Sequence, residues 1–192
     1  MTRTRNISIN GKEYILCYST RVVRAVTEEF GSPGKMNYAL TESESAEERL
    51  ETMLFVLHKL MEAGARFSDM EGIENPKVPS LKELHALFPL MHPQKVIRSI
   101  KDAITFGSAV SVEIKDIEPK GKGKGKTRAP KKLKPTIDRY IWYGLHIGLD
   151  YNTALDIPHG ELLSLINEEM LQSGTAEEKI TNSEEDPFPD WE

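Results

Sequence analysis

The chain lacks several features that define particular protein classes. It has a single cysteine, Cys17, so it cannot form an internal disulfide, which fits a reducing compartment. It has no apolar run of about 18 residues, so we expect no transmembrane helix. The opening segment Met1-Thr2-Arg3-Thr4-Arg5 leads into an alternating pattern and not into an apolar signal core. We therefore do not expect secretion by a signal peptide.

Catalytic and metal-binding motifs are also missing from the sequence. The five histidines do not form the His-Glu-x-x-His spacing of a zinc hydrolase, and no second cysteine is present for a thiolate zinc site. There is no phosphate-binding loop and no Gly-x-Ser-x-Gly nucleophile turn. We predict a protein that is not an enzyme and that holds no cofactor and no metal.

Charge is distributed unevenly along the 192 residues, although the net charge is only −5. Residues 1–118 carry 15 basic and 17 acidic side chains, residues 119–135 carry 8 basic and none acidic, and residues 136–192 carry 2 basic and 13 acidic. The Gly/Lys/Pro composition of 119–135 favours an extended, self-repelling linker. We predict four parts: an α+β block over 1–118, the basic linker over 119–135, a small helical module over 136–174 and an acidic disordered tail over 175–192.

The pattern of the first block predicts an α+β fold that is mostly helical. Residues 5–18 read as a β-hairpin around Asn10-Gly11, a pair that favours a type I′ turn and places Ile7 opposite Tyr14. We expect a loop over 32–42. Alternation from Val110 to Ile114 indicates a strand that could join the hairpin as its third. The predicted helices cover residues 20–30, 45–63, 80–88 and 93–106.

The helix over 45–63 has the strongest apolar pattern. Its apolar residues recur every three or four positions and surround most of its middle, which is typical of a helix buried between other elements. We expect it to end at Gly64. An alternative is a partner-binding face formed by Leu50, Met53 and Leu57.

The segment after the linker is small but rich in large apolar side chains. About 40 residues rarely fold alone without a disulfide, a metal or a partner. Aromatic side chains that such a small body cannot bury are candidate interface anchors. We therefore select as partner-binding residues Trp142, Tyr143, Leu145, Tyr151, Leu162 and Leu163.

Three stretches of sequence resemble the tail assembly chaperones of long-tailed phages and prophages. The first is Ile7-Ser8-Ile9-Asn10-Gly11-Lys12-Glu13-Tyr14 with the following Val-rich helix and Phe30-Gly31, and the second is Leu60-Met61-Glu62-Ala63-Gly64-Ala65. The third is Trp142-Tyr143-Gly144-Leu145-His146-Ile147-Gly148-Leu149-Asp150-Tyr151 with Pro158-His159-Gly160-Glu161-Leu162-Leu163, which resembles the extension of the family's long form.

The resemblance implies a role in phage tail assembly within the host cytoplasm. In that family the first block coats the tape-measure protein, the extension recruits tail-tube subunits, and the finished virion does not keep the chaperone. The long form commonly arises by a programmed ribosomal frameshift, which would fall near the linker here. Self-association is a further expectation, whereas membrane binding is not expected.

The basic linker supports an alternative function. Its eight cations could bind nucleic acid through phosphate contacts, as in a small nucleic-acid-associated or regulatory protein. The linker has no aromatic residue that could stack on a base, and the whole chain is acidic. We therefore prefer the interpretation of a solvated hinge, with nucleic acid an unexpected partner.

Overall fold

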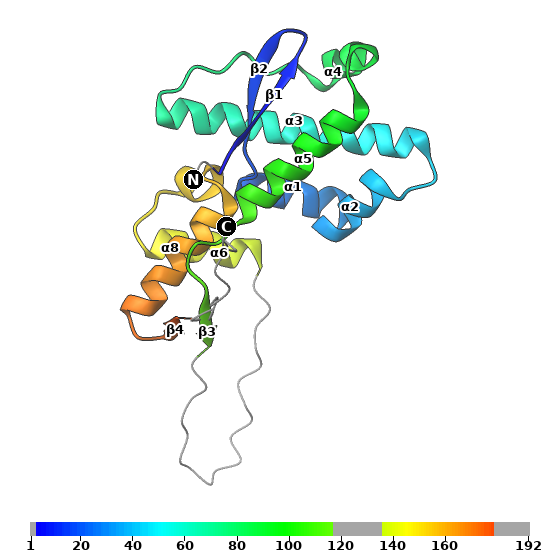
Figure 1. The fold of residues 1–192 in the computed structure, drawn as a ribbon. Coiled ribbons are helices and arrows are strands. Elements are labelled where there is room, and N and C mark those ends of the chain that lie inside the picture. Colours follow the sequence, from blue (N-terminus) through cyan, green and yellow to red (C-terminus); the bar gives the residue numbers. More distant parts are fainter. Residues whose placement is uncertain (1–2, 117–135, 179–192) are drawn as a thin grey trace, which may run out of the picture.

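The computed structural model describes residues 3–116 and 136–178, which form a mostly helical α+β structure (Figure 1). The predicted fold class is confirmed. The linker over 119–135 and the acidic segment from residue 179 onward lie outside the described residues. In chain order the elements are β1 (Arg5–Ile9), β2 (Lys12–Leu16), α1 (Thr20–Phe30), α2 (Pro33–Thr41), α3 (Ala46–Glu71), α4 (Leu81–Leu87), the 3-10 helix η1 (Phe88–Leu90), α5 (Pro93–Ser108), β3 (Ile114–Asp116), α6 (Ile137–His146), α7 (Tyr151–Asp156), α8 (His159–Gln172) and β4 (Ala176–Glu178).

The N-terminal hairpin has the predicted register. Strands β1 and β2 pair antiparallel with Ile7 opposite Tyr14. The connecting Asn10 and Gly11 both have positive φ, 48° and 74°, as a type I′ turn requires. Alternation of side chains then buries one face of the hairpin, formed by Ile7, Ile9, Tyr14 and Leu16.

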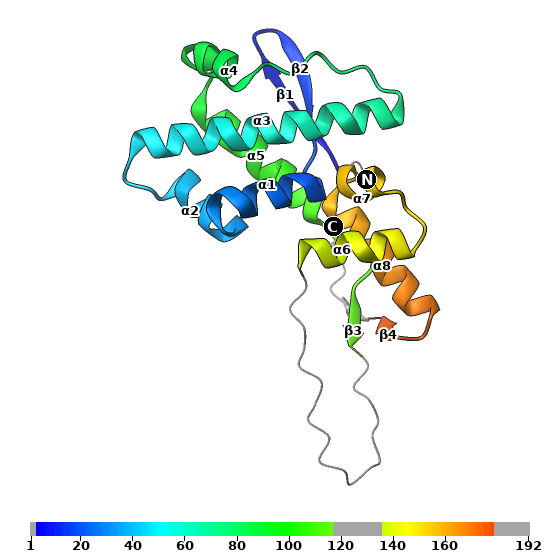
Figure 2. The ribbon, with the colours of Figure 1, turned by 180° about the vertical axis from the view of Figure 1, so that it is seen from behind.

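Helix α3 crosses the hairpin and forms the centre of the core (Figure 2). The predicted end at Gly64 was wrong, because α3 continues to Glu71 and ends where Gly72 adopts φ 66°. Gly64 lies where β2 touches the helix: a Cβ at this position would come within 1.8 Å of the Ile15 carbonyl oxygen. The glycine is needed for close approach of two backbones and not to stop the helix.

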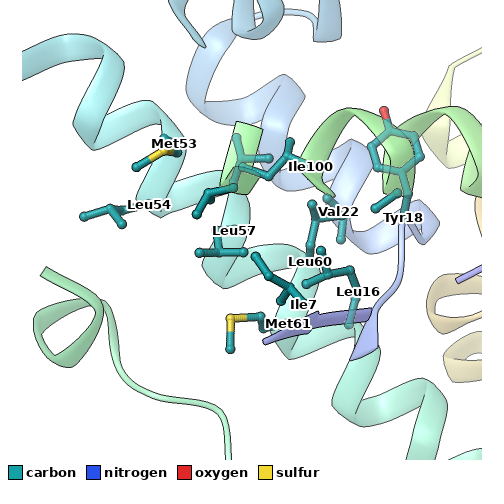
Figure 3. Close-up of a cluster of buried hydrophobic side chains, with 14 of the residues drawn as sticks. Ile7, Leu16, Tyr18, Val22, Met53, Leu54, Leu57, Leu60, Met61 and Ile100 are labelled. Carbon is teal, nitrogen blue, oxygen red and sulfur yellow. The ribbon is translucent and has the colours of Figure 1, made fainter. Parts of the chain in front are cut away.

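The main core confirms that α3 is a buried helix. Side chains from its middle pack against the hairpin, α1 and α5, as the close-up of Figure 3 shows. Leu54, Leu57, Leu60 and Met61 are fully buried. Full burial of one such side chain contributes on the order of 1.5–3 kcal/mol, so this cluster is the main source of stability in residues 3–116.

The strand predicted over 110–114 is wrong for residues 110–113, because β3 begins only at Ile114, and β3 does not join the hairpin. β3 pairs antiparallel with β4, with Ile114 opposite Glu178. The cause lies just before β3, where the chain is held by α8: the Asn167 side-chain amide donates to the Val112 carbonyl oxygen at 2.6 Å. The disordered tail predicted from residue 175 is wrong at its start, because Ala176–Glu178 forms β4.

The loop predicted over 32–42 is also wrong, since Pro33–Thr41 forms α2. The Ser32 hydroxyl accepts a hydrogen bond from the Lys35 N–H at 3.2 Å, and Pro33 occupies the first helical turn, where its missing N–H does no harm. Burial of Met36 and Leu40 against the core completes the helix.

Candidate functional site

Residues after the linker pack directly against the first block. Asp156 of α7 receives two hydrogen bonds from the Arg21 guanidinium of α1, at 2.6 and 2.9 Å. The His159 N–H donates to the Tyr18 carbonyl oxygen at 2.9 Å. Figure 2 shows α6, α7 and α8 beside the end of α1. The boundary predicted at 119–135 stays a prediction, because those residues are not described.

The Arg21–Asp156 pair is a charged link between α1 and α7. The Asp156 side chain is only 6% exposed, whereas that of Arg21 is 36% exposed. The hydrogen bond that Arg21 donates to Asp156 raises the pKa of Arg21 above its ordinary value. Two parallel N–H donors on one carboxylate fix the relative orientation of the two helices.

His159 begins α8 and is buried in the same interface. Its Nδ1 lies 3.1 Å from the Thr20 hydroxyl, and its ring meets the Tyr140 ring edge-on at 5.6 Å between centroids. Burial lowers the pKa of His159 to about 4. The imidazole is therefore neutral at pH 7 and acts as a packed polar group.

Helix α8 lies unusually close to the chain that follows α5. A Cβ on Gly160 would come within 2.2 Å of the Ala109 carbonyl oxygen. The Ser111 N–H donates to the Ser164 hydroxyl oxygen at 3.0 Å, and Ser164 in turn donates to the Gly160 carbonyl oxygen at 2.7 Å. These contacts join α8 to the first block at a second place, away from the Arg21–Asp156 pair.

The region after the linker also has a small core of its own. Leu162 is fully buried there with Ala154, Ile157 and Ile166. The prediction that Leu162 contacts a partner is therefore corrected, because its side chain fills the space above Gly144. Tyr143 and Leu163 are half-buried, so they can contribute only part of their surface to an interface.

Three of the predicted partner-binding residues remain exposed on α6 and at the start of α7. Trp142 is 56% exposed, Leu145 43% and Tyr151 49%. The Trp142 ring stacks on His146, at 5.3 Å between centroids and 10° between planes. It also meets the edge of Tyr143 at 5.1 Å. We call Trp142, Leu145, His146 and Tyr151 the aromatic surface.

Tyr151 links the aromatic surface to α1. Its hydroxyl interacts with Arg24, and the pKa of Arg24 is raised first by the Glu28 carboxylate and then by Tyr151. The Arg24 Nε lies 3.0 Å from Glu28 Oε1. Polar groups around an exposed aromatic ring resemble the polar rim of a protein interface.

The α3 residues predicted for partner binding lie mostly in the core. Met53 is 2% exposed and Leu57 is fully buried, so neither forms a free face on the helix surface, and that prediction is corrected. Leu50 is half-buried. Leu50 and Met53 nevertheless line a groove of about 640 Å³ between α2, α3 and α5. We call it the α2–α3–α5 groove.

Chemistry elsewhere in the described residues is sparse. No group of three or more His, Cys, Asp or Glu side chains in residues 3–116 and 136–178 is placed to hold a metal ion. Cys17 is buried, and burial with the nearby Asp156 and Glu161 charges raises its pKa to about 12, so it packs as a neutral thiol. Within the same ranges, every helix is too short or too polar to cross a bilayer.

Comparison with known proteins adds no relative. No protein-family model, no curated protein and no solved structure matches the chain.

Proposed function

We propose that the protein is a non-enzymatic tail assembly chaperone of a long-tailed phage or prophage. It acts in the host cytoplasm, binds the tape-measure protein, recruits tail-tube subunits and is absent from the finished virion. The three stretches of resembling sequence support this proposal, and two of them occupy separate parts of the structure, the hairpin with α1 and the region α6–α8.

The observation that carries the proposal is the exposed ring of Trp142. More than half of its surface is exposed, and its ring contacts His146 and Tyr143. Tryptophan is enriched among the few residues that dominate interface energies. The proposal assigns this surface to the tail-tube subunit.

The α2–α3–α5 groove supplies a second surface. It presents Leu50 beside Phe88 and Ile97, and an apolar groove of this kind suits the apolar face of a partner helix. The proposal assigns the groove to the tape-measure protein. Two sites on one framework raise the effective concentration of one partner near the other.

Capture of purified tail-tube subunits by the full chain tests the proposal. We expect Trp142→Ala to reduce binding at least tenfold, because loss of an anchoring aromatic side chain commonly costs about 2 kcal/mol or more. Tyr38→Ala is the matched control, since Tyr38 on α2 is 57% exposed and outside the aromatic surface. Equal binding by all three proteins would refute the assignment of the aromatic surface.

A further inference from the structure

The α2–α3–α5 groove combines apolar walls with a basic rim. Its apolar lining comes from four elements, and its charged lining residues are Arg49 and Lys101. Among the described residues that line the groove there is no Asp or Glu. The chain as a whole has a net charge of −5, so the groove is a local basic site on an acidic protein. The apolar lining residues are Leu40, Ala46, Leu50, Met53, Phe88, Pro93 and Ile97.

These features define the chemistry of an occupant. Apolar walls favour large apolar anchors, and two cations without a neighbouring carboxylate in the lining favour acidic groups beside those anchors. Residues 184–192 of the chain, Glu-Glu-Asp-Pro-Phe-Pro-Asp-Trp-Glu, have this composition, with five carboxylates, no basic residue and two aromatic rings.

We propose that the groove binds the chain's own acidic segment, residues 184–192. Phe188 and Trp191 supply the apolar anchors, and the neighbouring carboxylates face Arg49 and Lys101. The short segment Pro187-Phe188-Pro189 has restricted backbone freedom, because proline fixes φ and limits the preceding residue. This lowers the entropy lost when the segment is ordered in a groove.

The chain geometry allows this contact within one molecule. The Cα atoms of Lys101 and Ile114 are at most about 30 Å apart. From Lys101 to Ser108 the chain follows α5, which advances about 1.5 Å per residue. From Ser108 to Ile114 even a fully extended chain advances only about 3.3 Å per residue. Ile114 pairs with Glu178, and Figure 1 shows α5 running from the side of α4 toward α8 and β3. The ten residues from Glu178 to Phe188 span up to about 33 Å.

Occupation by the acidic segment would close the groove to another apolar partner. A tape-measure helix would then have to displace the segment, which makes binding competitive. The inference concerns the groove and the segment alone and holds whether or not the proposed function does. Its test below uses no phage partner, so the failure of one proposal is distinguishable from the failure of the other.

Fluorescence of Trp191 in the full chain tests the proposal. The chain has two tryptophans, so Trp142→Phe leaves Trp191 as the only indole. We expect acrylamide to quench Trp191 several-fold less in this protein than in a peptide of residues 184–192, with blue-shifted emission. The protection should be independent of protein concentration, as expected for binding within one molecule.

Charge reversal locates the bound segment. In the Trp142→Phe protein, the further substitutions Arg49→Glu and Lys101→Glu should raise quenching of Trp191 to the value of the peptide. The control pair Lys35→Glu and Lys82→Glu changes the charge by the same amount outside the groove lining. It should leave the quenching of Trp191 unchanged. Arg49 also donates to the Ser43 carbonyl oxygen at 2.7 Å, so circular dichroism must show that the variant is folded.

A charge swap avoids any change in the folded part. With the native groove, Asp190→Lys and Glu192→Lys should expose Trp191 to acrylamide. When the same two substitutions are combined with Arg49→Glu and Lys101→Glu, protection of Trp191 should return. Three results would overturn the proposal: Trp191 as accessible as in the peptide, protection that survives reversal of the groove charges, or protection that grows with protein concentration, which would place the segment on a second copy.

Discussion

The regions before and after the linker are stabilised in different ways. Residues 3–116 bury a continuous apolar cluster around α3, where Leu57 and Leu60 are fully buried. Residues 136–178 have a much smaller core around Leu162 and are fixed to the first region by polar contacts such as Arg21–Asp156. The first region therefore depends on apolar burial, whereas the second depends on the first for support.

This difference explains why the second region keeps apolar side chains on its surface. About 40 residues offer too little volume to enclose every large side chain. Contact with Tyr18 and Thr20 of the first region covers His159, whereas Trp142, Leu145 and Tyr151 stay exposed. The apolar surface that such a small body cannot enclose is thus covered in part by the first region, and we propose that a partner covers the exposed remainder.

The largest expected effect tests the apolar dependence of the first region. Gly64→Ala places a Cβ 1.8 Å from the Ile15 carbonyl oxygen, so β2 and α3 must separate. We expect a loss of about 4 kcal/mol or more in the free energy of unfolding, the upper range for single substitutions. Urea unfolding followed by circular dichroism measures it.

Gly34→Ala on α2 is the control for Gly64→Ala. The closest atom to its Cβ would be Ser32 Oγ at 3.9 Å, and a helical glycine replaced by alanine gains about 0.5–1 kcal/mol. Similar unfolding midpoints for both variants would show that the close approach of β2 and α3 is not needed.

A pH titration tests the interface between the two regions. Because the pKa of His159 is about 4 in the folded chain and about 6.5 when unfolded, the unfolded state binds more protons between these values. Stability should be complete above pH 6.5 and should fall by about 3 kcal/mol as pH decreases to 4. Unfolding by urea at a series of pH values measures this loss.

His159→Gln should flatten that pH dependence, whereas His146→Gln should not, since His146 is exposed. Hydrogen exchange should locate the acid-induced loss in α7 and α8. An unchanged pH profile in the His159 variant would mean that this histidine does not control the interface.

A smaller effect is expected from Asp156→Asn, which removes the charge that pairs with Arg21. The amide can keep only part of the bidentate contact, and Arg21 is partly screened by solvent, so we expect a loss of about 1–2 kcal/mol. The loss should increase hydrogen exchange in α7 and α8 while β1 and β2 stay protected. Uniform exchange across the whole chain would instead indicate that the two regions open together.

Arg24→Gln is the matched control for this pair. Arg24 forms an exposed i,i+4 pair with Glu28, and such pairs contribute little to stability because solvent screens them. An effect as large as that of Asp156→Asn would contradict the special role of the buried carboxylate.

Local features of the fold were predictable from sequence, and close approaches between distant segments were not. Asn10-Gly11 determines the hairpin register, and Ser80 with Glu83 forms a capping box at the start of α4. Both signals act over a few residues. Gly64 read as a helix stop because nothing near it in sequence shows that Ile15 lies against it.

The same limit applies to the candidate site. Composition singled out the aromatic residues of α6, and the structure leaves Trp142 exposed as expected. Leu162 and Met53 have the same apolar character, yet packing buries them. Nothing in a single sequence tells which of several equivalent apolar residues faces a neighbouring element, since that depends on contacts such as those of α8 with Ala109. For the same reason, the sequence could not predict the groove between α2, α3 and α5.

Hydrogen exchange of the full chain, with and without the tail-tube subunit, tests the central claim most directly. The account predicts that binding slows exchange in α6 and at the start of α7, around Trp142 and Tyr151, and leaves the α3 core unchanged. Protection confined to α2 and α5, or no protection at all, would contradict the claim that the aromatic surface is the recruitment site.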